Sequence, residues 1–258
     1  MNSRIYYIAS NTFREAVRDR VLYNLIAFAL LLTGGAVLVG QISIDIERLV
    51  VINLGLTSVS LFGLVIAIFI GIGLVSKEIE KRTLYTVLSR PVRRWEFIAG
   101  KFCGLSGTLV VNTVFMAVGV FAALLYVSHN LQGADAWVLV ALYFIVLQFL
   151  IITALSLFFS SFSSPLLSAL FAFALFVIGS FSEDLRGFAA MAHGVTKWLA
   201  TATAYVIPNF SALNIINQVA HGTAVGGSLI FWNTIYTLVY TLAVLCGAVL
   251  VFEHRNLK

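Results

Sequence analysis

Few residues in this chain could perform catalysis or hold a metal ion, and they are scattered. The four histidines lie far apart in the sequence: His129, His193, His221 and His254. Neither H-E-x-x-H nor G-x-S-x-G occurs, and Cys103 and Cys246 are isolated in apolar runs without the spacing of a metal site or a disulfide framework. The chain is therefore not expected to be an enzyme, or to bind a metal or cofactor directly.

A second group of residues offers hydrogen bonds inside otherwise apolar segments. The candidates that could touch a substrate are Asn53, Thr57, Asn112 and Gln148. Packing and hydrogen bonds between helices account for most such residues in membrane bundles. The alternative is that they line a path for an amphipathic substrate, and the sequence leaves both interpretations open.

The elements that must position these residues cross a membrane. Of the 258 residues, 60% are hydrophobic and 10% charged, whereas a soluble domain has roughly 25% charged residues. This composition excludes a soluble enzyme or a free binding module. About 20 apolar residues cross a bilayer, and runs of about this length predict six transmembrane helices in one all-α, polytopic domain over residues 1–258. The runs cover residues 21–40, 51–75, 102–127, 137–159, 165–181 and 230–252.

Lysine and arginine set the predicted orientation of these spans. Thirteen of the 16 lie on the side that holds both termini of a six-span chain, and the other side has only Arg48, Arg186 and Lys197. Because cytoplasmic loops are enriched in these residues, both termini are predicted to be cytoplasmic, in a plasma (inner) membrane protein. The net charge of +5 is thus a topology signal, and no nucleic-acid partner is expected.

Residues 1–20 precede the first span and are predicted to form an interfacial amphipathic helix. Ile8, Thr12 and Ala16 fall on one broad face, and Arg14 and Arg18 fall on the opposite, polar face. Such a helix lies on membrane lipid with its arginines near anionic headgroups. It either anchors the first span only or also contacts a cytoplasmic partner.

Residues 76–101 join the second and third spans and form the most polar segment. A plain connection needs about five residues, and this one has 26. Leu84, Val87 and Leu88 recur at helical spacing, and Pro91 suits the first turn of a second short helix. A cytoplasmic helix that docks on a partner explains the length and the periodicity, whereas an ordinary positive loop explains only the charge.

Three stretches of the sequence are informative together: E-K-R-T-L at residues 80–84, P-V-R-R-W-E-F-I-A-G-K at residues 91–101 and I-P-N-F-S-A-L-N at residues 207–214. With the order of the spans, they resemble the type-2 ATP-binding-cassette permeases, and especially the branch labelled as multicopper-enzyme-maturation permeases. Many members have glycine where this chain has Arg82. The histidines lack ligand spacing, so the branch label does not imply copper binding here.

The resemblance implies that the loop carries a cytoplasmic coupling helix, which rests in a groove of a separate ATPase subunit. The contacts that it implies, by position, are Glu78, Glu80, Lys81, Arg82, Thr83, Leu84, Tyr85, Leu88, Arg90 and Pro91. The chain has no G-x-x-x-x-G-K-[ST], so ATP and Mg²⁺ are expected on the partner ATPase. The implied assembly is an exporter in which this permease pairs with a second copy, or a related chain, and with ATPase subunits.

Residues 182–228 are predicted to be external and amphipathic. From Leu185 to Val206 apolar residues recur every three to four positions, and Arg186 and Lys197 lie on the opposite stripe. This pattern predicts one amphipathic helix at the outer leaflet. The helix either closes the top of the bundle or forms a gate or a docking surface for an extracytoplasmic protein.

Two other functions stay open at the level of sequence. An ion-coupled secondary transporter usually places Asp, Glu, His or Lys at membrane depth. The six predicted spans contain none of these residues, although backbone carbonyls at broken helices can bind sodium. The other alternative is an ATP-driven mechanical or assembly module that moves no solute, and it would share every feature described above.

The predicted topology can be tested with single cysteines in a variant that lacks Cys103 and Cys246. Ser128→Cys and Gly222→Cys should react with a membrane-impermeant maleimide in intact cells, because both positions are predicted to be external. Ser163→Cys should react only after permeabilisation. Labelling of Ser163→Cys from outside would contradict a cytoplasmic hairpin between the fourth and fifth spans.

Overall fold

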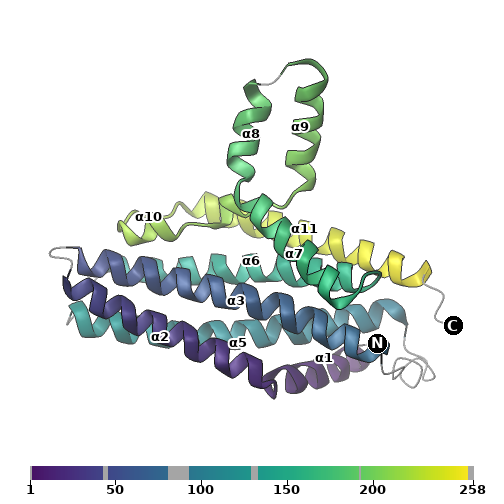
Figure 1. Cartoon of the computed structure of the whole chain (residues 1–258), viewed down its shortest axis with the longest axis horizontal. Coiled ribbons are helices and arrows are strands. Elements are labelled where there is room, and N and C mark those ends of the chain that lie inside the picture. The colour runs from purple at the N-terminus through teal and green to yellow at the C-terminus, as the bar shows by residue number, and fades with distance from the viewer. Residues whose placement is uncertain (1, 43–45, 81–92, 129–132, 192, 255–258) are drawn as a thin grey trace.

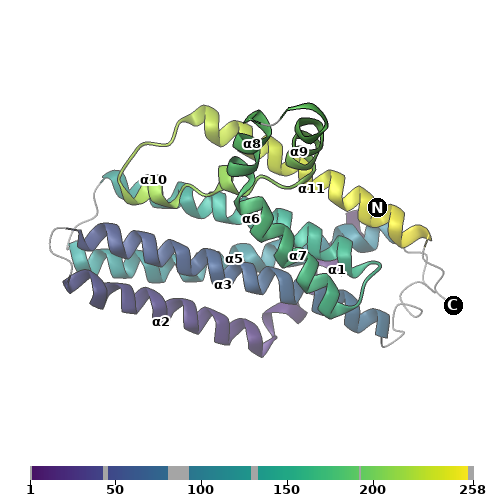
Figure 2. The same ribbon diagram turned by 45° about the horizontal axis from the view of Figure 1, so that its top comes forward.

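The computed structural model describes residues 2–42, 46–80, 93–128, 133–191 and 193–254. These residues form helices and contain no β-strand, which confirms the predicted all-α fold. The long helices run side by side as a bundle, and two short helices, α8 (Ser182–Met191) and α9 (Gly194–Val206), stand away from it (Figure 1). Figure 2 shows the same arrangement with α9 seen close to end-on.

Five long helices contain segments apolar enough to cross a membrane. They are α2 (Arg20–Ile42), α3 (Glu47–Glu80), α5 (Arg94–Ser128), α6 (Ala136–Ser160) and α11 (Gly227–His254). With 34 and 35 residues, α3 and α5 are each about 50 Å long. Since the hydrocarbon core of a bilayer is about 30 Å thick, both helices project beyond it.

The fifth predicted span is only partly a crossing helix. It corresponds to α7 (Pro165–Ser180), whose 16 residues reach about 24 Å. The chain then bends by 58° into α8, so the described residues contain five spanning helices, or six if α7 and α8 form one broken span. At the bend, a Cβ on Gly179 would lie 2.4 Å from the carbonyl oxygen of Pro208, and only glycine allows the returning chain to approach so closely.

The break predicted between the fourth and fifth spans is present. The hydroxyls of Ser160 and Ser161 donate to the carbonyl oxygens of Leu157 and Phe158 at the end of α6. Pro165 then occupies the first turn of α7, where its missing N–H leaves no helical hydrogen bond unmade. The serine cluster therefore ends one helix and the proline begins the next.

The prediction of a single amphipathic helix after α7 is wrong. The described residues form two helices, α8 and α9, and Gly194 at the start of α9 has a φ of +63°, a left-handed conformation that favours glycine. Residues 207–225 then fold back into the bundle as η2 (Ser211–Leu213) and α10 (Ile216–Ala220). Phe210 and Val219 are fully buried there. The segment is thus a projecting hairpin followed by a piece of the core.

The core lies around α3 and α6. Of their apolar segments 67% and 72% are buried, compared with 22% for α2 and 22% for α11. Large apolar side chains such as Leu31, Leu38 and Val239 are exposed on these two outer helices. Faces of this kind require lipid or another protein surface to cover them.

The N-terminal helix α1 (Asn2–Val17) has the predicted faces, but protein covers its apolar face. Thr12 and Ala16 are buried, whereas Arg14 and Arg18 are exposed. α1 packs on the first turns of α5. A Cβ on Gly100 would lie 2.7 Å from the Cβ of Ile8. A Cβ on Gly104 would lie 2.5 Å from the carbonyl oxygen of Ala9, so these glycines let the two helices touch.

This contact predicts that Gly104→Ala displaces α1, because the added methyl group meets backbone. Overpacking of this kind costs about 1–3 kcal/mol. The matched control is Gly107→Ala, one turn further along α5, where a Cβ would lie 3.7 Å from Phe13 in ordinary contact. Gly104→Ala should lower the unfolding temperature in detergent and speed tryptic cleavage at Arg14 and Arg18. If both variants had the same unfolding temperature and the same rate of tryptic cleavage, the position of α1 would not depend on the close contact at Gly104.

Candidate functional site

The loop predicted to bind an ATPase begins and ends at one end of the bundle. Of its ten predicted contacts, Lys81, Arg82, Thr83, Leu84, Tyr85, Leu88, Arg90 and Pro91 lie outside the described residues, and for Glu78 and Glu80 only the backbone, in the last turn of α3, is described. The start of α5, the start of α1 and the end of α11 lie at this same end (Figure 1). The described residues therefore show what the loop is attached to.

Glu96 joins the start of α5 to α1. Its Oε2 accepts a hydrogen bond of 2.9 Å from the backbone N–H of Arg93, the residue before the first turn of α5. A glutamate at the third helical position that reaches back in this way caps the helix. The same oxygen lies 3.9 Å from Nη1 of Arg4 on α1. Glu96 is 2% exposed, so this carboxylate is held inside the protein between the two helices.

Arg94 joins the same turn of α5 to α11. Its Nη1 donates to the carbonyl oxygen of Phe252 at 2.5 Å, and its guanidinium lies 5.8 Å from the centre of the Phe252 ring. Phe97 stacks on that ring with centroids 6.0 Å apart. The last carbonyls of a helix have no partner within the helix, so the arginine supplies one here. The end of α11 is thus tied to the start of α5.

Lys101 completes the loop-end junction, which we define as Arg4, Arg94, Glu96, Lys101 and Phe252 at the end of the bundle that carries the loop. The lysine is only 1% exposed, and its Nζ lies 5.7 Å from the centre of the Phe97 ring. Sequence reasoning treated this stretch as part of the loop and missed its role as a junction. The signals that could have revealed it were the glutamate three residues after Arg93 and the Gly-x-x-x-Gly spacing at residues 100–104.

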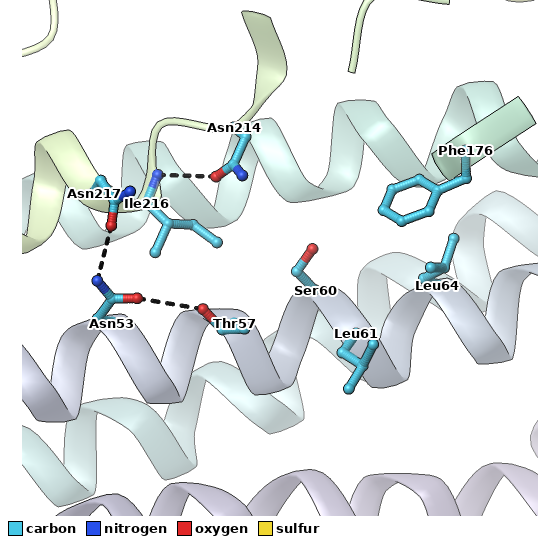
Figure 3. A pocket seen from close by; sticks show the side chains of 9 residues that line it. All are labelled: Asn53, Thr57, Ser60, Leu61, Leu64, Phe176, Asn214, Ile216 and Asn217. Carbon is cyan, nitrogen blue, oxygen red and sulfur yellow. Dashed lines mark hydrogen bonds between the residues drawn. The ribbon is translucent and has the colours of Figure 1, made fainter. Parts of the chain in front are cut away.

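At the opposite end of the bundle a polar cavity of about 260 Å³ lies between α3, α7 and the segment around α10. Figure 3 shows its lining: Asn53, Thr57, Ser60, Leu61 and Leu64 from α3, Phe176 from α7, and Asn214, Ile216 and Asn217. None of these side chains is charged. The lining thus combines amides and hydroxyls with aliphatic and aromatic surface.

Hydrogen bonds between the amides order one side of this cavity. Nδ2 of Asn53 donates to Oδ1 of Asn217 at 2.9 Å, and the hydroxyl of Thr57 donates to Oδ1 of Asn53 at 3.4 Å (Figure 3). Oδ1 of Asn214 accepts from the backbone N–H of Ile216 at 3.4 Å. The bond between Asn53 and Asn217 joins residues 164 positions apart and fastens α10 to α3. Sequence reasoning did not single out Asn217.

The four residues predicted to line a path divide into two pairs. Asn53 and Thr57 lie together in the cavity, whereas Asn112 on α5 and Gln148 on α6 are not among its lining residues. Both of the latter are buried, and among the described residues Nδ2 of Asn112 has no hydrogen-bond partner. The structure therefore groups only the first pair at one cavity.

The motif at residues 207–214 holds the root of the α8–α9 hairpin, which is the place where the hairpin joins the bundle. Oδ1 of Asn209 accepts from the hydroxyl of Ser182 at 2.5 Å and from the N–H of Ala212 at 3.1 Å. The N–H of Asn209 donates to the hydroxyl of Tyr236 at 2.8 Å. One asparagine thus joins α8, η2 and α11, and it holds the chain that leads to Asn214 in the cavity.

One ion pair closes the bundle near the start of α3. Arg48 donates to a carboxylate oxygen of Asp135, which is buried directly before α6. This pair joins the starts of the two central helices. Within the described ranges no three His, Cys, Asp or Glu side chains come together as a metal site would need.

Comparison with known proteins places this architecture in one family. The sequence model of the family described as ABC-2 family transporter protein matches residues 6–257. The curated proteins contain no match to the chain. The matched region includes all the spanning helices, the loop at residues 76–101 and the cavity. Because the match covers nearly the whole chain, this protein belongs to the ABC-2 family of transporter proteins and is a membrane subunit of an ABC transporter.

Proposed function

We propose that this subunit is the permease of an exporter driven by ATP hydrolysis on a separate ATPase, which binds residues 76–101. Membership of the ABC-2 family supports the transport role. The observation that carries the coupling role is the loop-end junction, because the segment that follows the loop is tied to both α1 and α11. Export, rather than uptake, rests on the resemblance of residues 80–101 to the type-2 permeases.

The junction gives a physical route for coupling. A displacement of the loop acts directly on the end of α3 and the start of α5, since the loop joins them. Glu96 and Arg94 tie α1 and α11 to α5, because separation would remove the Arg4 ion pair from the buried Glu96 carboxylate and the hydrogen bond from Arg94 to the end of α11. Glu80 lies 27 positions (80 − 53) after Asn53 on α3, which is about 40 Å along the helix. A rigid α3 therefore links the loop to the cavity.

The cavity is the proposed contact with substrate. Its amides and hydroxyls can bind polar uncharged groups, and Leu61, Leu64 and Phe176 offer apolar contact. A substrate that meets both kinds of surface is amphipathic. Asn53 and Thr57 are its proposed ligands on α3, and for Asn112 and Gln148 we propose a role in packing between α5 and α6.

The proposed assembly contains two permease copies and two ATPase subunits in the plasma membrane. The exposed apolar faces of α2 and α11 support contact with lipid and with a second permease chain. The orientation, with both termini in the cytoplasm, is supported by the basic residues in and directly after α1 and around the first turns of α5. These are Arg4, Arg14, Arg18, Arg93, Arg94 and Lys101.

The coupling proposal predicts that Leu84→Asp releases the ATPase. If Leu84 and Leu88 form an apolar ridge in an ATPase groove, the new carboxylate is buried without a partner, at a cost of several kcal/mol. The wild-type permease should co-purify with the ATPase at one-to-one stoichiometry, and recovery should fall at least tenfold with Leu84→Asp at matched membrane levels. The control Lys258→Asp adds the same group near the C-terminus and should recover the ATPase fully. Equal recovery with Leu84→Asp, with ATPase activity still responding to the permease, would make the loop an ordinary connector.

The hydrogen bond between Asn53 and Asn217 predicts that Asn53→Ala weakens the attachment of α10 to α3. The variant loses the bonds to Asn217 and Thr57, and one such bond contributes about 1 kcal/mol, equivalent to about fivefold in an opening equilibrium. Backbone amides of residues 216–220 should therefore exchange hydrogen about fivefold faster, as measured by mass spectrometry. Ser60 lines the same cavity and makes no hydrogen bond with the described residues, so Ser60→Ala is the matched control. The same exchange rate in both variants would show that the amide pair does not hold α10.

A further inference from the structure

A second polar cleft lies between α8 and α9. Its volume is about 520 Å³, and its lining consists of Arg186, Ala189 and Ala190 from α8 and Lys197, Thr201 and Tyr205 from α9. The three α9 residues are four positions apart and form one stripe of that helix. The small alanines leave room between the helices. The cleft therefore presents two cations and two hydroxyl groups to one space.

The two cations in this cleft are available to a ligand. Arg48, the third basic residue that the sequence places on this side, is bound to Asp135. Arg186 and Lys197 make no ion pair or hydrogen bond with the described residues. The carboxylate of Glu183 is held at the hairpin root, where it accepts from the hydroxyl of Ser211 at 3.0 Å. Neither Glu183 nor Asp184 lines the cleft.

Apolar surface borders the cleft directly. A neighbouring hollow of about 400 Å³ is lined by Lys197, Trp198, Thr201, Ala202 and Tyr205, so it shares three residues with the cationic cleft. Trp198 is 81% exposed. The nearby Met191 and Val195 are also exposed on the hairpin. A ligand that covers both hollows must join an anionic group to an apolar chain.

We propose that the α8–α9 cleft binds an anionic phospholipid. The phosphate would accept charge-assisted hydrogen bonds from Arg186 and Lys197 and further bonds from the hydroxyls of Thr201 and Tyr205. The acyl chain would lie along Trp198. Tryptophan and tyrosine favour the level of the headgroups, and basic side chains extend toward anionic lipid from apolar surroundings. The cations lie beside apolar surface on a projecting hairpin, and this favours an amphiphile over an acidic protein.

Bound lipid would act on the rest of the permease through the hairpin root. The hydroxyl of Tyr240 on α11 donates to the carbonyl oxygen of Val206 at 2.9 Å, and Asn209 binds Ser182 and Tyr236. A lipid held by the hairpin therefore fixes the bend between α7 and α8 relative to α11. This inference is independent of the proposed export function.

The test measures lipid contact at Trp198 in the full-length permease, in nanodiscs, without ATPase or nucleotide. Trp95, Trp137 and Trp232 are replaced by Phe, so that fluorescence reports Trp198 alone. Brominated phosphatidylglycerol is compared with brominated phosphatidylcholine as the quencher. Each cation near an anionic lipid contributes roughly a fivefold preference, so phosphatidylglycerol should be preferred at least fivefold. Arg186→Gln with Lys197→Gln should bring the preference close to one.

Three further variants keep the result interpretable. Lys197→Gln alone should lower the preference about fivefold, and Lys197→Arg should retain it. Arg14→Gln removes an exposed cation on α1 and should leave Trp198 quenching unchanged. Absence of quenching by both lipids would mean that protein, such as a second copy, covers this face, and equal quenching by both would mean apolar contact without headgroup binding. Loss of the preference in millimolar inorganic phosphate would indicate a free-anion site. Each of these three results would overturn the proposal.

Discussion

The first turns of α5 impose the constraint on which the loop end of the bundle depends. Glu96 and Lys101 are charged side chains buried within five positions of each other, and Gly100 and Gly104 bring the backbone of α1 against the same helix. A buried charge that loses its partner costs several kcal/mol, and a glycine contact leaves no room for adjustment. The helices at this end must therefore move together or not move.

This constraint divides the bundle into parts with different freedom. α1, α5 and α11 are joined at one end by Glu96 and Arg94. α3 enters the same loop from the other side, and at its far end it is tied by Arg48 to the start of α6 and by Asn53 to α10. A force on the loop would therefore act on two parts of the bundle: the joined helices α1, α5 and α11, and the long helix α3. The cavity lies where α3 meets α7 and α10.

Local patterns predicted the fold where the deciding interactions are local. Hydropathy located the long helices, the period of residues 4–20 gave both faces of α1, and the serines before Pro165 marked the break. The hairpin was missed because apolar residues recur every three to four positions on both sides of Gly194, so the period gave no sign of a turn. The ten predicted ATPase contacts between residues 78 and 91 stay a prediction, and so does the branch of the family.

Long-range contacts decided what sequence reasoning missed. Asn209 acts through Ser182 and Tyr236, each 27 positions away, and Asn53 acts through Asn217. No spacing rule relates such residues before the chain is folded. The Gly-x-x-x-Gly pattern on α5 was visible, but its partner proved to be α1 and not another spanning helix. A small-residue stripe predicts a close approach without naming the helix that approaches.

The lack of charged side chains in the cavity lining also limits how the proposed site could select a substrate. The buried charges lie elsewhere: Glu96 and Lys101 belong to the loop-end junction, and Asp135 is paired with Arg48, while the cavity near α10 has only amides, hydroxyls and apolar groups. Each neutral hydrogen bond adds only about 1 kcal/mol net, so affinity there must come mainly from apolar contact, at about 25 cal/mol per Å². In the proposed transport cycle, a substrate held in this way would be bound weakly enough to leave when α3 shifts. Strong ionic binding would instead trap it, so an uncharged cavity suits a step that ends in release.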